Sequence, residues 1–263
     1  MERNRHWPRG AQRLSNNAPL VIAHRGASAH EVENTLRSFQ RAVADGADGV
    51  ELDVQCCATG EVVVFHDDDL RRLAGRPERI DRLPLASLRQ VRLRSGGEIP
   101  TLAEALEICG PTGLVNVELK CSGASSGACR MLIARVAETV ARARAEDRVI
   151  VSSFSPAAVW RWQKQFPRVP CGLLFERPRP LRWPLPVNWL LSSLRPYAVH
   201  PEERLCTPEA VAGWLRCGYA VNVWTVDVAA RIEALAAMGV SGLITNDPGK
   251  ARAALGTQRG EGD

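Results

Sequence analysis

Long apolar runs are missing from this chain, and this absence limits where the protein can reside. No stretch approaches the roughly 20 apolar residues that a membrane-spanning helix needs. The N-terminal segment is basic and lacks the apolar stretch of a secretory signal peptide. We therefore expect a soluble, cytoplasmic protein, with a poorly ordered basic arm over residues 1–18 and a flexible tail over residues 256–263.

The chain also lacks a zinc-finger spacing of cysteines and a large net charge. Its eight cysteines are scattered singly, apart from Cys56 and Cys57, so we expect reduced thiols rather than disulfides. The net charge of +5 is mild, and arginines crowd the first stretch of the chain. This balance gives little support to a nucleic-acid partner, whereas a small anionic substrate is compatible with it.

What the sequence does contain is enough apolar material for one large domain. Hydrophobic residues make up 45% of the 263, and α/β barrels are often single domains of this size. Eight short β-prone runs alternate with helical patterns, and capping residues such as Thr101 with Glu104 mark helix starts. The eight runs are residues 20–23, the run around Glu51, and residues 115–120, 149–152, 172–175, 198–200, 219–224 and 242–245. Eight alternations predict a (β/α)8 (TIM) barrel over residues 19–255.

The second run and the segment after it carry the most informative pattern. Glu51 and Asp53 stand two residues apart in a β-prone run, so both carboxylates face one side of a strand and favour a cation between them. A second apolar run ends at His66 and follows too soon for a parallel crossover. We predict an antiparallel ribbon that turns at residues 59–60 and places His66 opposite Asp53. An edge hairpin with a solvated acidic face is the structural alternative.

An arginine-rich segment with weak periodicity follows His66. We interpret residues 68–98 as an insertion outside the main layer of the barrel.

Chemically active side chains gather at the ends of the predicted strands. In a (β/α)8 barrel the active site lies at these carboxyl ends, and a purely structural role would spread polar groups over both ends. The residues at the ends are His24, Arg25, Glu51, Asp53, Glu118, Lys120, Phe154, His200, Trp224, Asn246 and Asp247.

This set of groups fits cleavage of a phosphate ester. The carboxylates Glu51, Asp53 and Glu118 suit a hard divalent ion, Mg²⁺ or Ca²⁺, better than Zn²⁺. Arg25 and Lys120 are suited to an anion, and two imidazoles can remove one proton and supply another. Alternatives remain for single residues: Glu118 could pair only with Lys120, Trp224 could be core filling, and His200 is better explained as a structural group. We expect Glu33 and Asp67 to hydrogen-bond to the ligand side chains or to cap a helix, rather than to bind the metal themselves.

At these positions the chain resembles the glycerophosphodiester phosphodiesterases. The resemblance covers residues 20–250 and rests on several separated motifs in one order. The motifs are His24-Arg25-Gly26, Glu33-Asn34-Thr35, Glu51-Leu52-Asp53, His66-Asp67, residues 99–102, residues 117–120, residues 223–226 and residues 244–248.

The resemblance implies a metal-dependent barrel hydrolase that releases an alcohol and glycerol 3-phosphate. It matches His24 and His66 to an acid/base pair, and Glu51, Asp53 and Glu118 to metal ligands. It also matches Arg25 and Lys120 to phosphate-binding positions, and Trp224 to a wall for the glycerol moiety. Three positions depart from the usual pattern: the turn at residues 57–60, Val32, and Asp227, where an asparagine is frequent.

Two alternatives to this function stay open at the level of sequence. One is a phosphodiesterase of the same fold that cleaves lysophospholipids, and the other is a barrel that binds a phosphorylated ligand without turnover. Residues 181–191, rich in tryptophan and leucine beside arginines, could form a lid, a dimer contact or a peripheral membrane contact. A buried crossover helix is the structural alternative for this segment.

Overall fold

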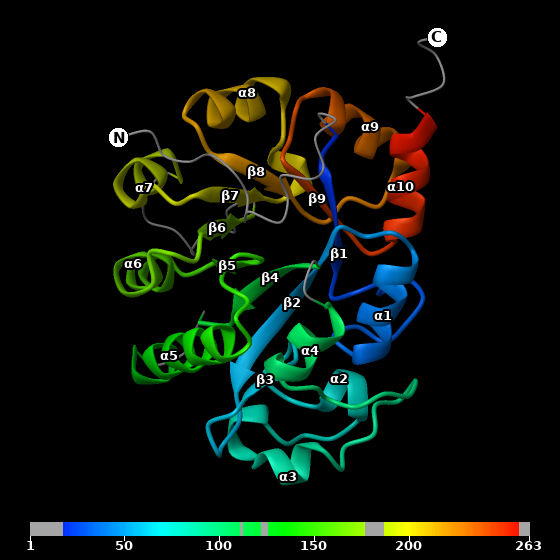
Figure 1. Cartoon of the computed structure of the whole chain (residues 1–263), viewed down its shortest axis with the longest axis vertical. Helices are drawn as coiled ribbons and strands as arrows, with labels where there is room; N and C mark the ends of the chain where they lie inside the picture. The colour runs from blue at the N-terminus through cyan, green and yellow to red at the C-terminus, as the bar shows by residue number, and fades with distance from the viewer. Residues whose placement is uncertain (1–17, 111–112, 122–125, 177–186, 258–263) are drawn as a thin grey trace.

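The strands form a closed parallel barrel with helices outside it (Figure 1). The computed structural model describes residues 18–110, 113–121, 126–176 and 187–257. Parallel pairing runs without a break from β2 to β9, and β1 pairs with both β2 and β9 to close the ring. The ring consists of β1 (Leu20–His24), β2 (Gly49–Cys56), β4 (Leu114–Leu119), β5 (Val149–Ser153), β6 (Cys171–Phe175), β7 (Ala198–Pro201), β8 (Ala220–Val223) and β9 (Gly242–Thr245). The predicted (β/α)8 barrel is confirmed.

Helices follow the strands around the outside of the ring. They are α1 (Leu36–Ala44), α4 (Leu102–Ile108), α5 (Ser126–Arg142), α6 (Pro156–Gln165), α7 (Val187–Leu194), α8 (Pro208–Arg216), α9 (Ala229–Ala237) and α10 (Pro248–Thr257). The expected capping box is present, since Thr101 and Glu104 each accept a hydrogen bond from the other's backbone. Our sequence reading did not predict α10, although Asp247 caps its first turn by accepting from the Lys250 backbone N–H.

The barrel interior and the layer under the helices have separate apolar cores. Val50, Leu52 and Val54 of β2 point outward and pack in the large cluster beneath the helices. Inside the barrel, a smaller apolar cluster contains Leu20, Ile22, Leu114, Ile150, Ala198 and Ile244. This apolar floor places the polar side chains further along the strands, at their carboxyl ends.

His200 is fully buried inside the barrel, in agreement with the structural role that we predicted. Its Nε2 lies 3.1 Å from Asn222 Nδ2, and its ring occupies space that a side chain at residue 172 would need, because a Cβ on Gly172 would lie 2.5 Å from the ring. Burial lowers the pKa of His200 from 6.5 to about 3.

This depressed pKa predicts a loss of stability in acid. The unfolded chain binds a proton on His200 below pH 6.5 while the folded chain does not, so the free energy of unfolding falls as the pH drops toward 3. Between pH 6.5 and about pH 4 the contribution is about 3 kcal/mol. Urea unfolding at both pH values measures it. The His200→Asn variant should lose less stability on acidification, and an identical loss in both proteins would contradict this account.

The ribbon after β2 has the predicted antiparallel pairing but a different register. β3 (Val62–Val64) pairs Val54 with Val64 and Cys56 with Val62, which places Phe65, not His66, opposite Asp53. Our register was wrong by one residue because the turn has three residues instead of two. Gly60, at φ +92°, takes the left-handed position that closes such a turn.

The insertion after β3 packs on its own small core. It contains α2 (Arg71–Ala74), the 3-10 turn Ile80–Arg82 and α3 (Leu85–Leu88). Phe65, Leu70, Ile80 and Leu88 are buried together there, apart from the barrel cores. Several of its arginines pair with neighbouring acids, including Arg76 with Glu78, Arg79 with Asp81 and Arg92 with Glu98. Its basic character is therefore partly neutralised by these local ion pairs.

The described part of the chain holds no helix with the length and apolar character to cross a membrane. Within residues 181–191, positions 187–191 belong to α7, and the rest lies outside the described residues. Leu190 and Leu191 are buried and Trp189 is 55% exposed, so this part matches a packed crossover helix with one exposed aromatic side chain.

Candidate active site

Three buried carboxylates from two adjacent strands meet at the mouth of the barrel. Glu51 and Asp53 point inward from β2, and Glu118 on β4 is paired directly with Asp53 across the parallel ladder. One oxygen from each carboxylate lies within 4.8 Å of the others. The structure thus brings together the three predicted metal ligands, and it excludes the alternative of a solvated acidic face.

The pKa values of these three carboxyls are shifted in different directions. Burial, Asp53 and Glu118 raise the pKa of Glu51 well above its usual range, and burial with the nearby Asp53 also raises that of Glu118. Burial opposes ionisation of Asp53 as well, but Lys120 and Arg25 together lower its pKa. Carboxyls that retain protons in a buried cluster are suited to exchange them for a cation.

Two cationic side chains partly occupy this space. Lys120 Nζ lies 2.6 Å from Glu118 Oε1 and 2.8 Å from Asp53 Oδ1, so Lys120 pairs with both acids rather than with Glu118 alone. Arg25 Nε lies 3.1 Å from Asp53 Oδ2. Neither Asp53 Oδ1 nor Arg25 Nε makes a hydrogen bond of good geometry, although both are buried. An all-oxygen donor set with an incompletely satisfied carboxylate fits a hard divalent cation.

The two predicted catalytic histidines lie on either side of the carboxylates. His24 Nε2 is 4.0 Å from Glu51 Oε2, and His66 interacts electrostatically with both Asp53 and Glu118. Burial, followed by the neighbouring Arg25, lowers the pKa of His24. Both imidazoles therefore lie near the cluster, and their catalytic role stays a prediction.

Different partners hold the two imidazoles. His24 Nδ1 lies 2.7 Å from the amide oxygen Oδ1 of Asn246, whereas His66 Nδ1 lies 2.7 Å from the carboxylate oxygen Oδ1 of Asp67. The carboxylate carries a charge when ionised, whereas the amide oxygen is neutral. The two histidines are therefore placed in unequal environments.

Arg72, from the insertion, is a supporting residue that the sequence analysis missed. Its guanidinium bonds to both Asp67 and Glu33, and Glu33 in turn bonds to Arg25. Burial opposes ionisation of Glu33 and Asp67, but these hydrogen bonds lower the pKa of both. The insertion thus helps to fix both Arg25 and His66. Arg72 stands five positions after Asp67 in an arginine-rich segment, so nothing in the sequence distinguished it from its neighbours.

Aromatic side chains form one wall of the mouth. Trp224 packs edge-on against Phe154 with ring centroids 5.5 Å apart, and its Nε1 donates to the backbone oxygen of His200. Trp224 is partly exposed and also packs against the apolar cluster inside the barrel. A pocket of about 460 Å³ opens beside His24 and Arg25 and is bordered by Asp227, Asn246 and Lys250.

Comparison with known proteins matches the sequence of this chain to one family. The model of the glycerophosphoryl diester phosphodiesterase family matches residues 24–250. This chain belongs to that family. A glycerophosphodiester phosphodiesterase of Caldanaerobacter subterraneus subsp. tengcongensis is 34% identical over 239 residues, which cover 87% of this chain and 94% of the relative. The chain is accordingly a phosphodiesterase.

Solved structures of the family share the fold. A phosphodiesterase of Oleispira antarctica, in complex with the product sn-glycerol-3-phosphate, is 29% identical with a TM-score of 0.80, covering 91% of this chain and 97% of that one. A glycerophosphodiester phosphodiesterase of Thermotoga maritima is 27% identical with a TM-score of 0.73, covering 88% and 96%. Family membership therefore extends over the whole barrel.

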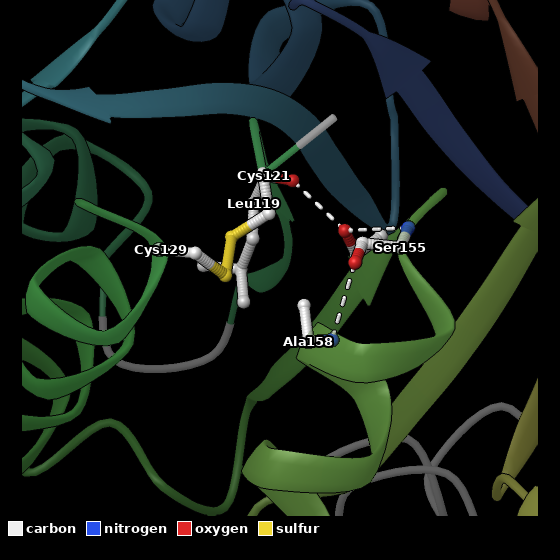
Figure 2. The surroundings of a disulfide bond; sticks show 6 residues. Leu119, Cys121, Cys129, Ser155 and Ala158 are labelled. Atoms are coloured by element: carbon white, nitrogen blue, oxygen red, sulfur yellow. Dashed lines mark hydrogen bonds between the residues drawn. A yellow bond between two sulfur atoms is a disulfide. The ribbon is translucent and has the colours of Figure 1, made fainter. Parts of the chain in front are cut away.

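A disulfide lies directly beside the site in this family member. Cys121 follows Lys120 after β4 and is bonded to Cys129 near the start of α5, with their Cα atoms 5.2 Å apart (Figure 2). Our expectation of reduced thiols is wrong for these two residues, because the return of α5 against the barrel brings together cysteines that showed no recognisable spacing. On the other side of Lys120, the Leu119 carbonyl accepts from Ser153 Oγ. The backbone on both sides of Lys120 is thus anchored.

Removal of this disulfide is expected to lower stability. Cys129→Ser opens a loop closed over a separation of eight residues, and the expected loss is about 2–3 kcal/mol. Urea unfolding with and without a reductant measures it. Cys217→Ser, at an exposed free thiol, is the matched control and should unfold like the wild type. If the reductant left the wild-type midpoint unchanged, the disulfide would contribute nothing.

Proposed function

We propose that this phosphodiesterase hydrolyses glycerophosphodiesters to an alcohol and sn-glycerol 3-phosphate, using a divalent cation and a pair of histidines. The observation that carries the proposal is the cluster of Glu51, Asp53 and Glu118 between two imidazoles at the mouth of the barrel. The product bound to the Oleispira antarctica relative supports the choice of substrate class.

In this proposal the cluster holds Mg²⁺ or Ca²⁺. A bound cation would polarise the phosphoryl oxygens and offset the charge that develops during cleavage. Arg25 and Lys120 already contact the carboxylates, and they are within reach of an anion at the same place. We assign phosphate binding to these two side chains and contact with the glycerol moiety to Trp224.

We assign the proton acceptor to His24 and the proton donor to His66. The lowered pKa of His24, which burial causes, favours a neutral ring at working pH. His66 is oriented by the Asp67 carboxylate through Nδ1, and we assign it the complementary role. His24 would take the proton from an attacking water, and His66 would return one to the leaving alcohol.

The test is release of glycerol 3-phosphate from glycerophosphocholine with Mg²⁺ or Ca²⁺, repeated in the presence of a chelator. Product formation that needs the cation would support the proposal. Absence of product with either cation would favour the alternative of a barrel that binds a phosphorylated ligand.

The exposed Trp189 on α7 favours keeping the lysophospholipid alternative. As an exposed apolar side chain within the segment 181–191, Trp189 would suit an acyl chain or a peripheral membrane contact. Sedimentation with anionic vesicles, comparing wild type with Trp189→Ala, tests this contact. The contact is excluded if neither protein pellets with the vesicles.

A further inference from the structure

His24 is held by a chain of hydrogen bonds that runs from Asp227 through Asn246. Asp227, in the loop after β8, accepts hydrogen bonds through Oδ1 from Thr245 Oγ1 at 2.9 Å and from the Asn246 backbone N–H at 2.8 Å. Its other oxygen, Oδ2, lies 2.6 Å from the side-chain Nδ2 of Asn246. A carboxylate only accepts, so the Asn246 amide must present its NH₂ group to Asp227.

The opposite side of the same amide meets His24. With its NH₂ turned to Asp227, Asn246 presents Oδ1 to His24 Nδ1 at 2.7 Å and to Ser28 Oγ at 2.8 Å. An amide oxygen only accepts, so the hydrogen in this contact belongs to His24 Nδ1. A neutral imidazole carries one N–H, and the other nitrogen, Nε2, is therefore left as an acceptor. Nε2 is the atom that faces Glu51.

We propose that Asp227 is a positioning residue that selects the tautomer of His24 through Asn246. The proposal rests on the proposed role of His24 as proton acceptor, because only the tautomer with a bare Nε2 can take a proton at the metal cluster. Asp227 touches neither the cluster nor His24 in any contact that the structure shows, and its effect is transmitted by the amide.

The backbone N–H of Asn246 fixes the direction of the hydrogen bonds between residue 227 and the Asn246 side chain. A reversed Asn246 amide would place its oxygen against Asp227 Oδ2, so that two acceptors would face each other without a hydrogen. At residue 227, one oxygen is required by the backbone N–H of Asn246, which cannot change direction. The direction of the whole chain of bonds is therefore set by residue 227.

Replacement of Asp227 by asparagine should reverse the tautomer of His24. In Asp227→Asn, the amide oxygen at 227 must still accept from the backbone N–H, so its NH₂ group faces Asn246. Asn246 must then turn its oxygen toward residue 227 and its NH₂ toward His24 Nδ1. His24 Nδ1 becomes an acceptor, and the hydrogen moves to Nε2.

A second variant should restore the original arrangement. In the exchange Asp227→Asn with Asn246→Asp, the carboxylate at 246 accepts from the new amide and from His24 Nδ1. Every hydrogen bond is then satisfied with Nε2 bare.

The experiment compares wild type, Asp227→Asn and the double exchange in steady-state kinetics with glycerophosphocholine. We expect kcat of the single variant to fall about 10²-fold with KM changed by less than about threefold, and the double exchange to recover most of kcat. Thermal unfolding of each variant identifies loss of folding. A folded single variant with unchanged kcat, or a folded double exchange without recovery, would overturn the proposal.

Long-range ¹H–¹⁵N NMR of His24 tests the tautomer without relying on activity. We expect a hydrogen on Nδ1 in the wild type and the double exchange, and on Nε2 in Asp227→Asn. A hydrogen on Nε2 in the wild type would refute the assignment. A wild type without activity, or full activity in His24→Ala, would instead refute the proposed function, and the NMR result would still decide the tautomer.

Discussion

Replacement of His24 or His66 by alanine is expected to lower kcat for glycerophosphodiester hydrolysis by about 10²–10⁴-fold. Each imidazole flanks the carboxylate cluster, and each is held through Nδ1 so that Nε2 is free for proton transfer. Among the described contacts of His24 and His66, no other histidine lies close enough to replace the lost imidazole. Steady-state release of glycerol 3-phosphate at saturating substrate measures the loss.

His30→Ala is the matched control for these two variants. His30 follows His24 closely in the chain, is 40% exposed, and pairs with Asp247 outside the cluster. It should retain wild-type kcat. Full activity in either His24→Ala or His66→Ala would contradict the acid/base assignment, whereas an equal loss in His30→Ala would point to general damage to the fold.

Glu51→Gln is expected to weaken binding of the divalent cation by more than about 100-fold. Loss of a residue that only hydrogen-bonds to a metal ligand costs roughly 10–100-fold, and Glu51 is itself a proposed ligand. The amide keeps the size of the side chain but removes one of three charges from the cluster. Activity at low cation concentration should fall with the affinity. Isothermal titration of Mg²⁺ and Ca²⁺ into the metal-free protein measures the change.

The same titration has an expected pH dependence with a definite sign. In the metal-free protein, burial and the neighbouring acids raise the pKa of Glu51 and Glu118, so these carboxyls hold protons to higher pH than usual. A cation binds the ionised form and must displace those protons. Affinity should therefore rise with pH, and protons should be released on binding.

Titrations in two buffers with different ionisation enthalpies count the released protons. Glu138→Gln, which changes an exposed acid that pairs with Arg135 and Arg142, is the matched control and should bind like the wild type. Cation affinity that did not change with pH, or binding without proton release at mildly acidic pH, would contradict the raised pKa values.

The barrel, and the side chains that meet at its mouth, could be predicted from the amino-acid sequence. Strand period places Glu51 and Asp53 on one face, and the position of active residues at strand ends followed from the parallel barrel alone. These features depend on local periodicity and on a rule that holds for every member of the fold. For that reason they could be read without coordinates.

Register and long-range pairing required the tertiary structure. The turn at Gly60 has one residue more than we predicted, and no local pattern fixed that number. Likewise, Cys121 meets Cys129, and Arg72 reaches Glu33, only because separate elements fold back on the barrel.

The hydrogen bond between His24 and Asn246 shows most clearly why such pairings need the tertiary structure. His24 and Asn246 are separated by 222 positions in the sequence. They become neighbours because β1 pairs with β9 to close the barrel, with Ala23 aligned to Thr245. The sequence supplied the chemical groups at the strand ends, whereas closure of the ring decided which of them share hydrogen bonds and in which direction.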